Sequence, residues 1–218
     1  MFPLGTSFLP GDPVVLNVFE DRYRQLISDV TTTDRLFGTV LIERGSEVGG
    51  DDKRFSHGVL VLVQTAEEID GIIRVVGVAT NIISIDTWLT DQPYPRAEFS
   101  IQASDEMATS ERTSCAADLS VVAQNIRSLH ERMRQAFQPV PIDQRKSSIL
   151  ASVAGGRWWD DNVSDPELWR TFWFLASLVP CTSLDRYELL HHGQLSERLT
   201  RLRRIIDHVV EIIDFRTM

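Results

Sequence analysis

The sequence predicts an α+β protein in which a β-rich N-terminal part, residues 1–103, precedes an all-helical C-terminal part, residues 113–218. Three observations predict this order. Short runs with strand-type alternation fill the first part, apolar residues at helical spacing fill the second, and the polar stretch 104–112 separates them as a linker. With 218 residues and 43% hydrophobic content, the chain is long enough to bury a normal core.

The N-terminal part begins with a strand and a helix. The Pro10-Gly11-Asp12-Pro13 turn leads into a half-buried strand over residues 14–18. Apolar residues then recur at helical spacing from Phe19 to Val30. Further strands are predicted at 37–43, 58–66, 72–79, 82–88 and 94–101. Asp70-Gly71 predicts a type I′ hairpin turn, and this series of short strands indicates a small barrel or closed sheet.

Helical spacing dominates the C-terminal part. Apolar residues from Leu119 to Phe137 step by three or four positions, and two prolines follow them. Asp165 is predicted as an N-cap with Pro166 at the first helical position. The last helix carries an apolar stripe from Leu195 to Ile213, with arginines, including Arg198, around its flanks.

The charge is concentrated in the first half of the chain. Residues 1–105 hold 16 acidic and 8 basic residues, a net charge of −8 out of −9 for the whole chain. This acidity disfavours nucleic acid as a partner. No long apolar run or signal peptide is present, so we expect a cytoplasmic protein without a membrane partner. Cys115 and Cys181 are expected to pack in the core.

Motifs for catalysis are missing. The sequence has no P-loop, and its two lysines are poor candidates for a catalytic base. Lys53 follows two aspartates, which raise a lysine pKa, and Lys146 does not face Ser147 on a helix. The pair His191-His192 fits a helix end better than a metal site. We therefore expect no enzyme activity, no metal and no cofactor.

Several blocks resemble the N-terminal domain of Lon proteases. They are Phe2-Pro3-Leu4-Gly5-Thr6, Phe8-Leu9-Pro10-Gly11, Leu16-Asn17-Val18-Phe19-Glu20-Asp21-Arg22-Tyr23-Arg24, Phe37-Gly38-Thr39-Val40-Leu41-Ile42, Gly45-Ser46-Glu47-Val48-Gly49-Gly50, Leu178-Val179-Pro180 and Leu184-Asp185-Arg186-Tyr187-Glu188-Leu189-Leu190. The resemblance implies a PUA-like β pseudobarrel with one inserted helix, followed by a helical bundle. It also implies a stand-alone relative of the substrate-recognition domain, without ATPase or peptidase.

The function that this resemblance implies is binding of proteins or peptides without catalysis. The expected partners are unfolded or tagged polypeptides, together with a protease or chaperone that the chain serves as an adaptor for proteolysis or protein quality control. The alternative is a PUA-like protein that binds a small molecule or RNA, and the acidic first half counts against RNA.

Two groups of residues are singled out as a hypothetical peptide-binding site. Phe8 and Leu9 lie in a loop bounded by Pro and Gly, where we expect them to be at least partly exposed; packing of this loop against the barrel is the alternative. Trp158 and Trp159 form either an exposed aromatic groove or part of the helical core. The residues of the family signature are interpreted as structural: Pro3, Gly5, Pro10, Gly11, Phe19, Glu20, Arg22, Tyr23, Gly38, Gly49 and Gly50.

Overall fold

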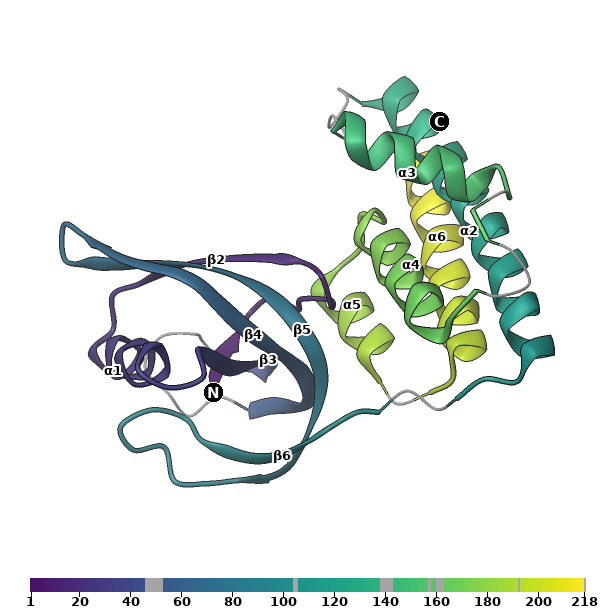
Figure 1. Cartoon of the computed structure of the whole chain (residues 1–218). Helices are drawn as coiled ribbons and strands as arrows, with labels where there is room; N and C mark the ends of the chain where they lie inside the picture. Colours follow the sequence, from purple (N-terminus) through teal and green to yellow (C-terminus); the bar gives the residue numbers. More distant parts are fainter. Residues whose placement is uncertain are drawn as a thin grey trace. The chain divides into compact units, whose positions relative to one another are not determined.

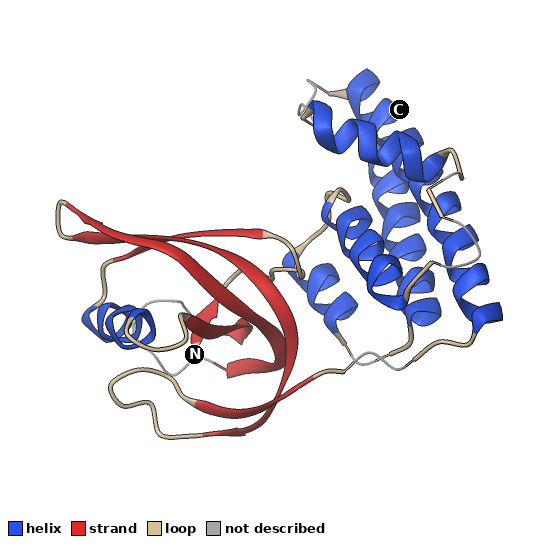
Figure 2. Cartoon of the chain, viewed as in Figure 1, coloured by secondary structure: helices blue, strands red, loops and turns tan. Residues whose placement is uncertain are grey.

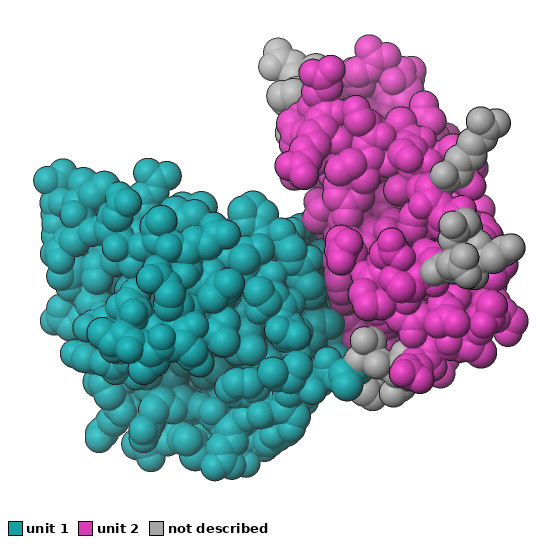
Figure 3. Space-filling model, viewed as in Figure 1, with its two compact units in different colours: residues 1–103, 182–192 teal, residues 104–181, 193–218 magenta. Residues whose placement is uncertain are grey.

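A computed structural model describes residues 1–45, 53–103, 106–137, 143–156, 158–159, 163–191 and 193–217. The chain splits into two compact units (Figure 3). Unit 1 comprises Met1–Ala103 and Thr182–His192, and unit 2 comprises Ser104–Cys181 and Gly193–Met218. The α+β fold class is confirmed. Thr182–His192, which the sequence analysis placed with the C-terminal helices, clusters with the sheet.

Unit 1 is built on one sheet of six strands. The strands are β1 (Phe2–Leu4), β2 (Pro13–Val18), β3 (Leu36–Arg44), β4 (Lys53–Ile69), β5 (Ile72–Trp88) and β6 (Ala97–Ile101). They follow the order β1-β3-β4-β5-β2, with β6 also paired to β5. Figures 1 and 2 show them curling into a half-barrel. Among the described strand pairs, β1 with β3 is parallel and the other pairs are antiparallel.

Strand β5 joins two runs that were predicted as separate strands, 72–79 and 82–88. Val61 pairs with Ala79 and Val59 pairs with Ile82, so β5 carries one more residue than β4 over this stretch. The polar Thr80 and Asn81 lie at this irregularity. An extra residue of this kind bends a strand without ending it, and a bend lets the sheet curl.

The β4–β5 hairpin has the predicted turn. Ile69 pairs with Ile72, which leaves Asp70 and Gly71 as a two-residue loop. Their φ angles are +51° and +80°, and both central residues of a type I′ turn need positive φ. The Asp-Gly dipeptide therefore determined the register of the two longest strands.

Helix α1 (Asp21–Thr31) is the helix inserted between β2 and β3, and its apolar face is buried. The Tyr23 ring stacks on Phe2 of β1 with ring centroids 4.0 Å apart. Phe19 was predicted to belong to the same apolar stripe, and this is wrong. It lies before the helix and is 60% exposed.

The N-terminus of the chain lies inside unit 1. Met1 packs with Val40, Leu60 and Ile83 in a buried cluster. Its α-amino group donates a hydrogen bond to the Pro95 carbonyl at 2.7 Å. Burial, with a further contribution from the charge of Arg54, lowers the pKa of this amino group from 8.0 to about 5.

Helix α5 (Ser183–Leu190) packs on β3 and β4 within unit 1. Thr182 caps its N-terminus: the Thr182 hydroxyl accepts from the Asp185 N–H, and the Asp185 carboxylate accepts from the Thr182 N–H. Tyr187 turns toward the sheet and contacts the Phe55 ring of β4, with ring centroids 4.1 Å apart.

Unit 2 consists of helices, as predicted. They are α2 (Thr109–Ala136), α3 (Gln144–Ala154), α4 (Asp165–Ser177) and α6 (Leu195–Thr217). Helix α2 contacts the other three, and its Leu119, Ile126 and Leu129 are fully buried. Phe137, predicted at the end of the same stripe, lies just beyond the helix and is 42% exposed.

Two details of unit 2 correct or add to the sequence analysis. The N-cap of α4 is Ser164 and not Asp165: the Glu167 carboxylate accepts from the Ser164 N–H and hydroxyl at 3.0 and 2.7 Å. Arg198 was predicted on a flank of the apolar stripe, with no statement of its exposure, and it is buried. Its guanidinium lies 5.2 and 5.3 Å from the ring centroids of Trp169 and Trp173, and burial lowers its pKa to about 10.

Candidate functional site

An apolar surface covers the outer side of three neighbouring strands in unit 1. Val78 of β5 pairs with Pro13 of β2 on one side and with Leu62 of β4 on the other. In the next row, Val76 pairs with Val15. Residues directly opposite each other on paired strands point to the same face of a sheet. We call Pro13, Val15, Leu62, Val76 and Val78 the outer apolar face.

The outer apolar face is open to solvent because β2 buries only its other side. Val14 and Val18 point inward and are 0% and 1% exposed, whereas Val15 between them is 52% exposed. Leu62 is 38% exposed, and Val76 and Val78 are half-buried. Alternation of this kind is usual for a strand, but the outward positions are normally polar. Here most of them are apolar.

Apolar residues also lie beyond this face. Phe19, the next alternate residue after Pro13, Val15 and Asn17, is 60% exposed. At the hairpin tip the paired Ile69 and Ile72 are 52% and 41% exposed.

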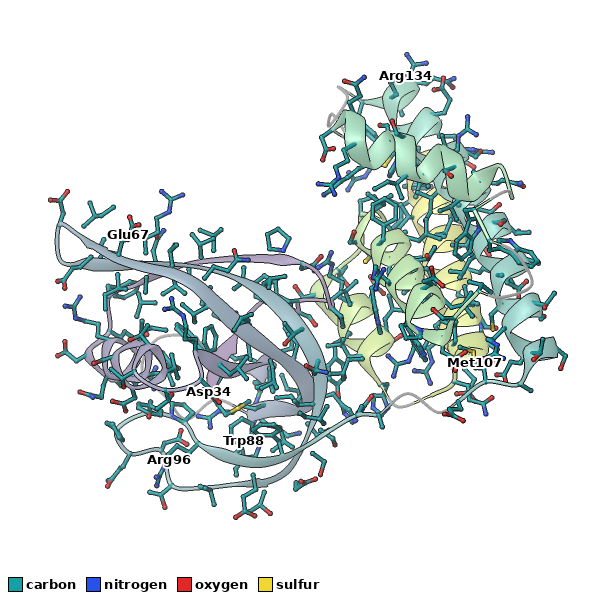
Figure 4. All side chains as sticks on the ribbon, viewed as in Figure 1. Asp34, Glu67, Trp88, Arg96, Met107 and Arg134 are labelled. Atoms are coloured by element: carbon teal, nitrogen blue, oxygen red, sulfur yellow. The ribbon has the colours of Figure 1, made fainter. Side chains whose placement is uncertain are left out.

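A polar row separates the hairpin tip from the outer apolar face. Arg74 pairs with Asn17 on one side and with Glu67 on the other. Glu67 is marked on the hairpin in Figure 4. The apolar surface is therefore divided into a larger and a smaller part.

The Phe8–Leu9 pair does not form the exposed surface that we expected. Leu9 is 0% exposed, so the expectation is wrong for this residue. Phe8 is half-buried and lines a narrow crevice together with Thr39, Gly58 and Leu190. The loop packs against the sheet, as in the alternative interpretation.

Asp12 holds this loop in place. Its carboxylate accepts a hydrogen bond from the Leu9 N–H at 2.9 Å. The same oxygen accepts from the Arg186 guanidinium of α5 at 2.7 Å, and Arg186 also donates to the Ser7 carbonyl at 3.3 Å. Asp12, the residue after the Phe8–Gly11 block, is therefore held by Arg186 of a block near the other end of the chain.

Trp158 and Trp159, the two tryptophans of the hypothetical peptide-binding site, lie in unit 2 and are both half-buried. The Trp158 indole N–H donates to the Ser120 hydroxyl at 3.1 Å. The Trp159 indole nitrogen is buried and finds no hydrogen-bond partner among the described residues. Their role in peptide binding stays a prediction.

Several residues of the family signature pair or pack within unit 1, and the structural role of the whole set stays a prediction. Glu20 and Arg22 form an ion pair of 3.0 Å, and the Arg22 guanidinium lies 4.5 Å from the centroid of the Tyr23 ring. Tyr23 is buried, as is Pro3, while Gly5 is exposed and Pro10 is half-buried. Gly49 and Gly50 lie outside the described residues.

At two signature positions, the structure gives a physical reason for the presence of glycine. Gly11 has a φ of +92°, a conformation that side chains strongly disfavour. A Cβ atom on Gly38 would lie 2.5 Å from the Met1 sulfur, closer than packed atoms come. Replacing Gly11 would strain the turn before β2, whereas a side chain at Gly38 would require the ends of the Met1 and Ile83 side chains to move.

The described residues do not assemble an evident catalytic or metal centre. Lys53 pairs with Glu43 at 2.8 Å. The rings of His57 and His191 lie 4.5 Å apart, but in the parts of the chain that the structure describes no three His, Cys, Asp or Glu residues gather as metal ligands. In the same parts, no helix has the length and apolar character needed to cross a membrane.

Sequence reasoning missed the outer apolar face, although a signal was present. The strand 14–18 was interpreted as half-buried, with Val14, Leu16 and Val18 on one side. The other side then carries Pro13, Val15 and Asn17, and only one of these three is polar. The rows across β4 and β5 could not be foreseen, because they depend on strand order and register.

Comparisons with known proteins agree with this architecture. Residues 1–208 match the family described as the ATP-dependent protease La (LON) substrate-binding domain. The fold is similar to the crystal structure of a Lon N-terminal domain protein from Xanthomonas campestris, with 22% identity, a TM-score of 0.57, and 93% of this chain and 95% of that chain covered.

The N-terminal domain of the Lon protease from the Mycobacterium avium complex is similar as well, with 18% identity, a TM-score of 0.57, and 94% and 96% of the two chains covered. No curated protein matches the chain. The match over residues 1–208 shows that this chain belongs to the family of Lon substrate-binding domains.

Proposed function

We propose that the chain is a non-catalytic module that binds unfolded polypeptides, and that the outer apolar face together with Phe19 is its contact surface. The observation that carries this proposal is the outer apolar face: one exposed apolar row crosses β2, β5 and β4, and the next row joins Val15 of β2 to Val76 of β5. Compact proteins rarely leave contiguous apolar patches in water unless the patch binds something.

The chemistry of this surface suits an unfolded client. An unfolded chain exposes apolar side chains that a folded protein hides, and their burial against Val15, Leu62 and Phe19 would drive binding. Specific sequence readout is not required, because hydrophobic contact is non-directional. Trp158 and Trp159 remain a second hypothetical contact region, on unit 2.

In this proposal the module acts in the cytoplasm as an adaptor. It binds the client, and a separate protease or chaperone then acts on that client. The family includes domains that bind protease substrates, which supports this role. Purified protein should therefore neither hydrolyse ATP nor cleave casein, and activity that copurifies with the chain through further steps would contradict the non-catalytic part of the proposal.

The test is binding to a permanently unfolded chain, reduced and carboxymethylated lactalbumin, measured by fluorescence anisotropy. Val15→Ser, Leu62→Ser and Phe19→Ser, combined in one variant, should weaken binding by about tenfold or more. The thermal midpoint should barely move, because these side chains are exposed.

A matched control is available on unit 2, where Val121 and Ile149 are 45% and 40% exposed. Serine at these two positions should leave binding unchanged. Equal loss in both variants, or loss in neither, would contradict the assignment of the surface. Binding of native lactalbumin with the same affinity as the unfolded form would contradict the proposed function itself.

A further inference from the structure

Strand β2 is an edge strand, since it pairs with β5 on one side and ends the strand order on the other. The Ala79 N–H donates to the Asp12 carbonyl at 2.9 Å. This bond determines which alternate residues of β2 direct their backbone groups toward β5. Val14, Leu16 and Val18 therefore direct their backbone groups toward β5. Val15 and Asn17 direct their N–H and C=O groups toward the open edge.

These edge groups are not used within the described part of the chain. The backbone N–H and C=O of Val15 and Asn17 form no hydrogen bond there with another element. Pro13 precedes them, and its missing N–H would also point to this edge. Two N–H and C=O pairs, two residues apart, match the hydrogen-bonding pattern of an extended backbone.

In the described part of the chain, the other edge strands of the sheet are better protected than β2. Strand β1 has three residues, all of them buried. Strand β6 carries the exposed Glu98 and a register irregularity opposite β5. Charges, prolines, bulges and shortness are the devices that prevent unwanted strand addition, and β2 has a proline only at its first residue, Pro13. Residues 13–18 contain no charged side chain.

We infer that the β2 edge of unit 1 binds a segment of the client as an additional strand, paired through the backbone groups of Val15 and Asn17. This inference rests on the proposed function and adds how the client is held. Backbone pairing gives affinity without reading a particular sequence. A module that serves many unfolded clients needs that property.

The surroundings of the edge favour an extended client. A strand added beside β2 would continue the sheet, and its alternate side chains would lie next to Val15 and Phe19 on the outer side. The segment would thus gain hydrogen bonds from the edge and apolar contact from the face. In a folded protein, the backbone N–H and C=O groups are already hydrogen-bonded within its own structure. The β2 edge therefore selects unfolded chains, whose backbone groups are free to pair.

The test separates backbone pairing from side-chain contact at one position. Asn17→Pro removes the edge N–H, and it leaves the ladder to β5 intact because this N–H does not point to β5. Asn17→Ala removes the same side chain and keeps the N–H. The probe is a short lysine-capped peptide of alternating valine and threonine, with binding measured by anisotropy.

Strand addition predicts that Asn17→Pro binds this peptide about tenfold more weakly than Asn17→Ala, which should stay within about twofold of the unchanged protein. Equal binding by the two variants would overturn strand addition while leaving the proposed function standing. If the unchanged protein binds neither this peptide nor unfolded lactalbumin, both ideas fail.

Hydrogen exchange provides a second measurement that needs no variant. Bound peptide should slow exchange of the Val15 and Asn17 amides, whereas the Phe99 amide of β6 should not change. Unprotected Val15 and Asn17 at saturating peptide would overturn the inference. So would a concentration-dependent dimer, seen by light scattering, that disappears in Asn17→Pro while peptide binding persists, because the edge would then bind a second copy of the chain.

Discussion

Residues 1–12 and residues 13–19 are consecutive and both carry large apolar side chains, yet the first segment is largely buried and the second shows a whole side to solvent. Leu9 in the first is 0% exposed, while Val15 and Phe19 in the second are 52% and 60% exposed. Local sequence suggested the opposite, since a Pro/Gly-bounded loop is normally the more exposed place. Long-range contacts decide the difference.

The first segment has partners on several sides. Strand β1 pairs with β3, the Met1 side chain lies in a buried cluster, and Asp12 is held by Arg186 from α5. In the described part of the chain, the second segment has β5 beside it and the core beneath it. The apolar side chains of Val15 and Phe19 are thus left exposed, which is the basis of the proposed function.

The largest effect should come from pH, through the buried amino group of Met1. Its pKa is about 5 in the folded chain and 8.0 when unperturbed. The unfolded chain therefore binds more protons between these values, and stability is lost as the pH falls from 8 toward 5. The free energy of unfolding should fall by up to about 4 kcal/mol over this window.

Urea unfolding at several pH values measures this loss. An N-terminally acetylated protein lacks the titrating amine and is the control, so its stability should vary less over the same window. If the two proteins give the same slope, Met1 is not the group that titrates, and the burial of the first segment would need another test.

Leu9→Ala and Val15→Ala contrast the two segments directly. Leu9 is fully buried, so its truncation should cost about 3 kcal/mol by losing apolar burial and leaving a cavity. Val15 is half exposed, and its truncation should change stability by no more than about 0.5 kcal/mol. Thermal or urea unfolding of both variants measures this difference. Similar losses would contradict the described exposure.

A smaller effect should follow from loosening the loop at Asp12. Asp12→Asn weakens the ion pair with Arg186, whose side chain is 20% exposed, and should cost about 1 to 2 kcal/mol. Asp214→Asn is the control, because Asp214 pairs with Arg132 where both side chains are about half exposed. Urea unfolding should show no measurable change in the control. A loss of equal size there would mean that burial does not strengthen the Asp12 pair.

The parts of the fold that local chemistry specifies could be predicted. Asp70-Gly71 gives its turn type through positive φ angles, and the spacing of Tyr23, Leu26 and Ile27 gives α1 one buried face. Strand β1 could not be predicted, because three residues show no period and the pairing with β3 joins distant segments. The same holds for α5, whose helix was foreseen but whose contact with the sheet was not.

The candidate surface was less predictable than the fold. The part of it that lies on one strand, Pro13 with Val15, can be predicted from the alternation along β2. The second and third strands enter only through the pairing of Val78 with Leu62 and of Val76 with Val15. The exposure of Leu9 was predicted wrongly because Leu9 is buried by long-range packing, which the sequence of the loop does not indicate.

The most direct test of the account is photo-crosslinking from the proposed surface. A benzoylphenylalanine residue at position 15 should crosslink to unfolded lactalbumin, because an exposed contact places the probe against the client. The same residue at position 121, exposed on unit 2, is the control and should give little crosslinking. Strong crosslinking from position 15 and weak crosslinking from position 121 would agree with the account. Efficient crosslinking from position 121 and none from position 15 would contradict it.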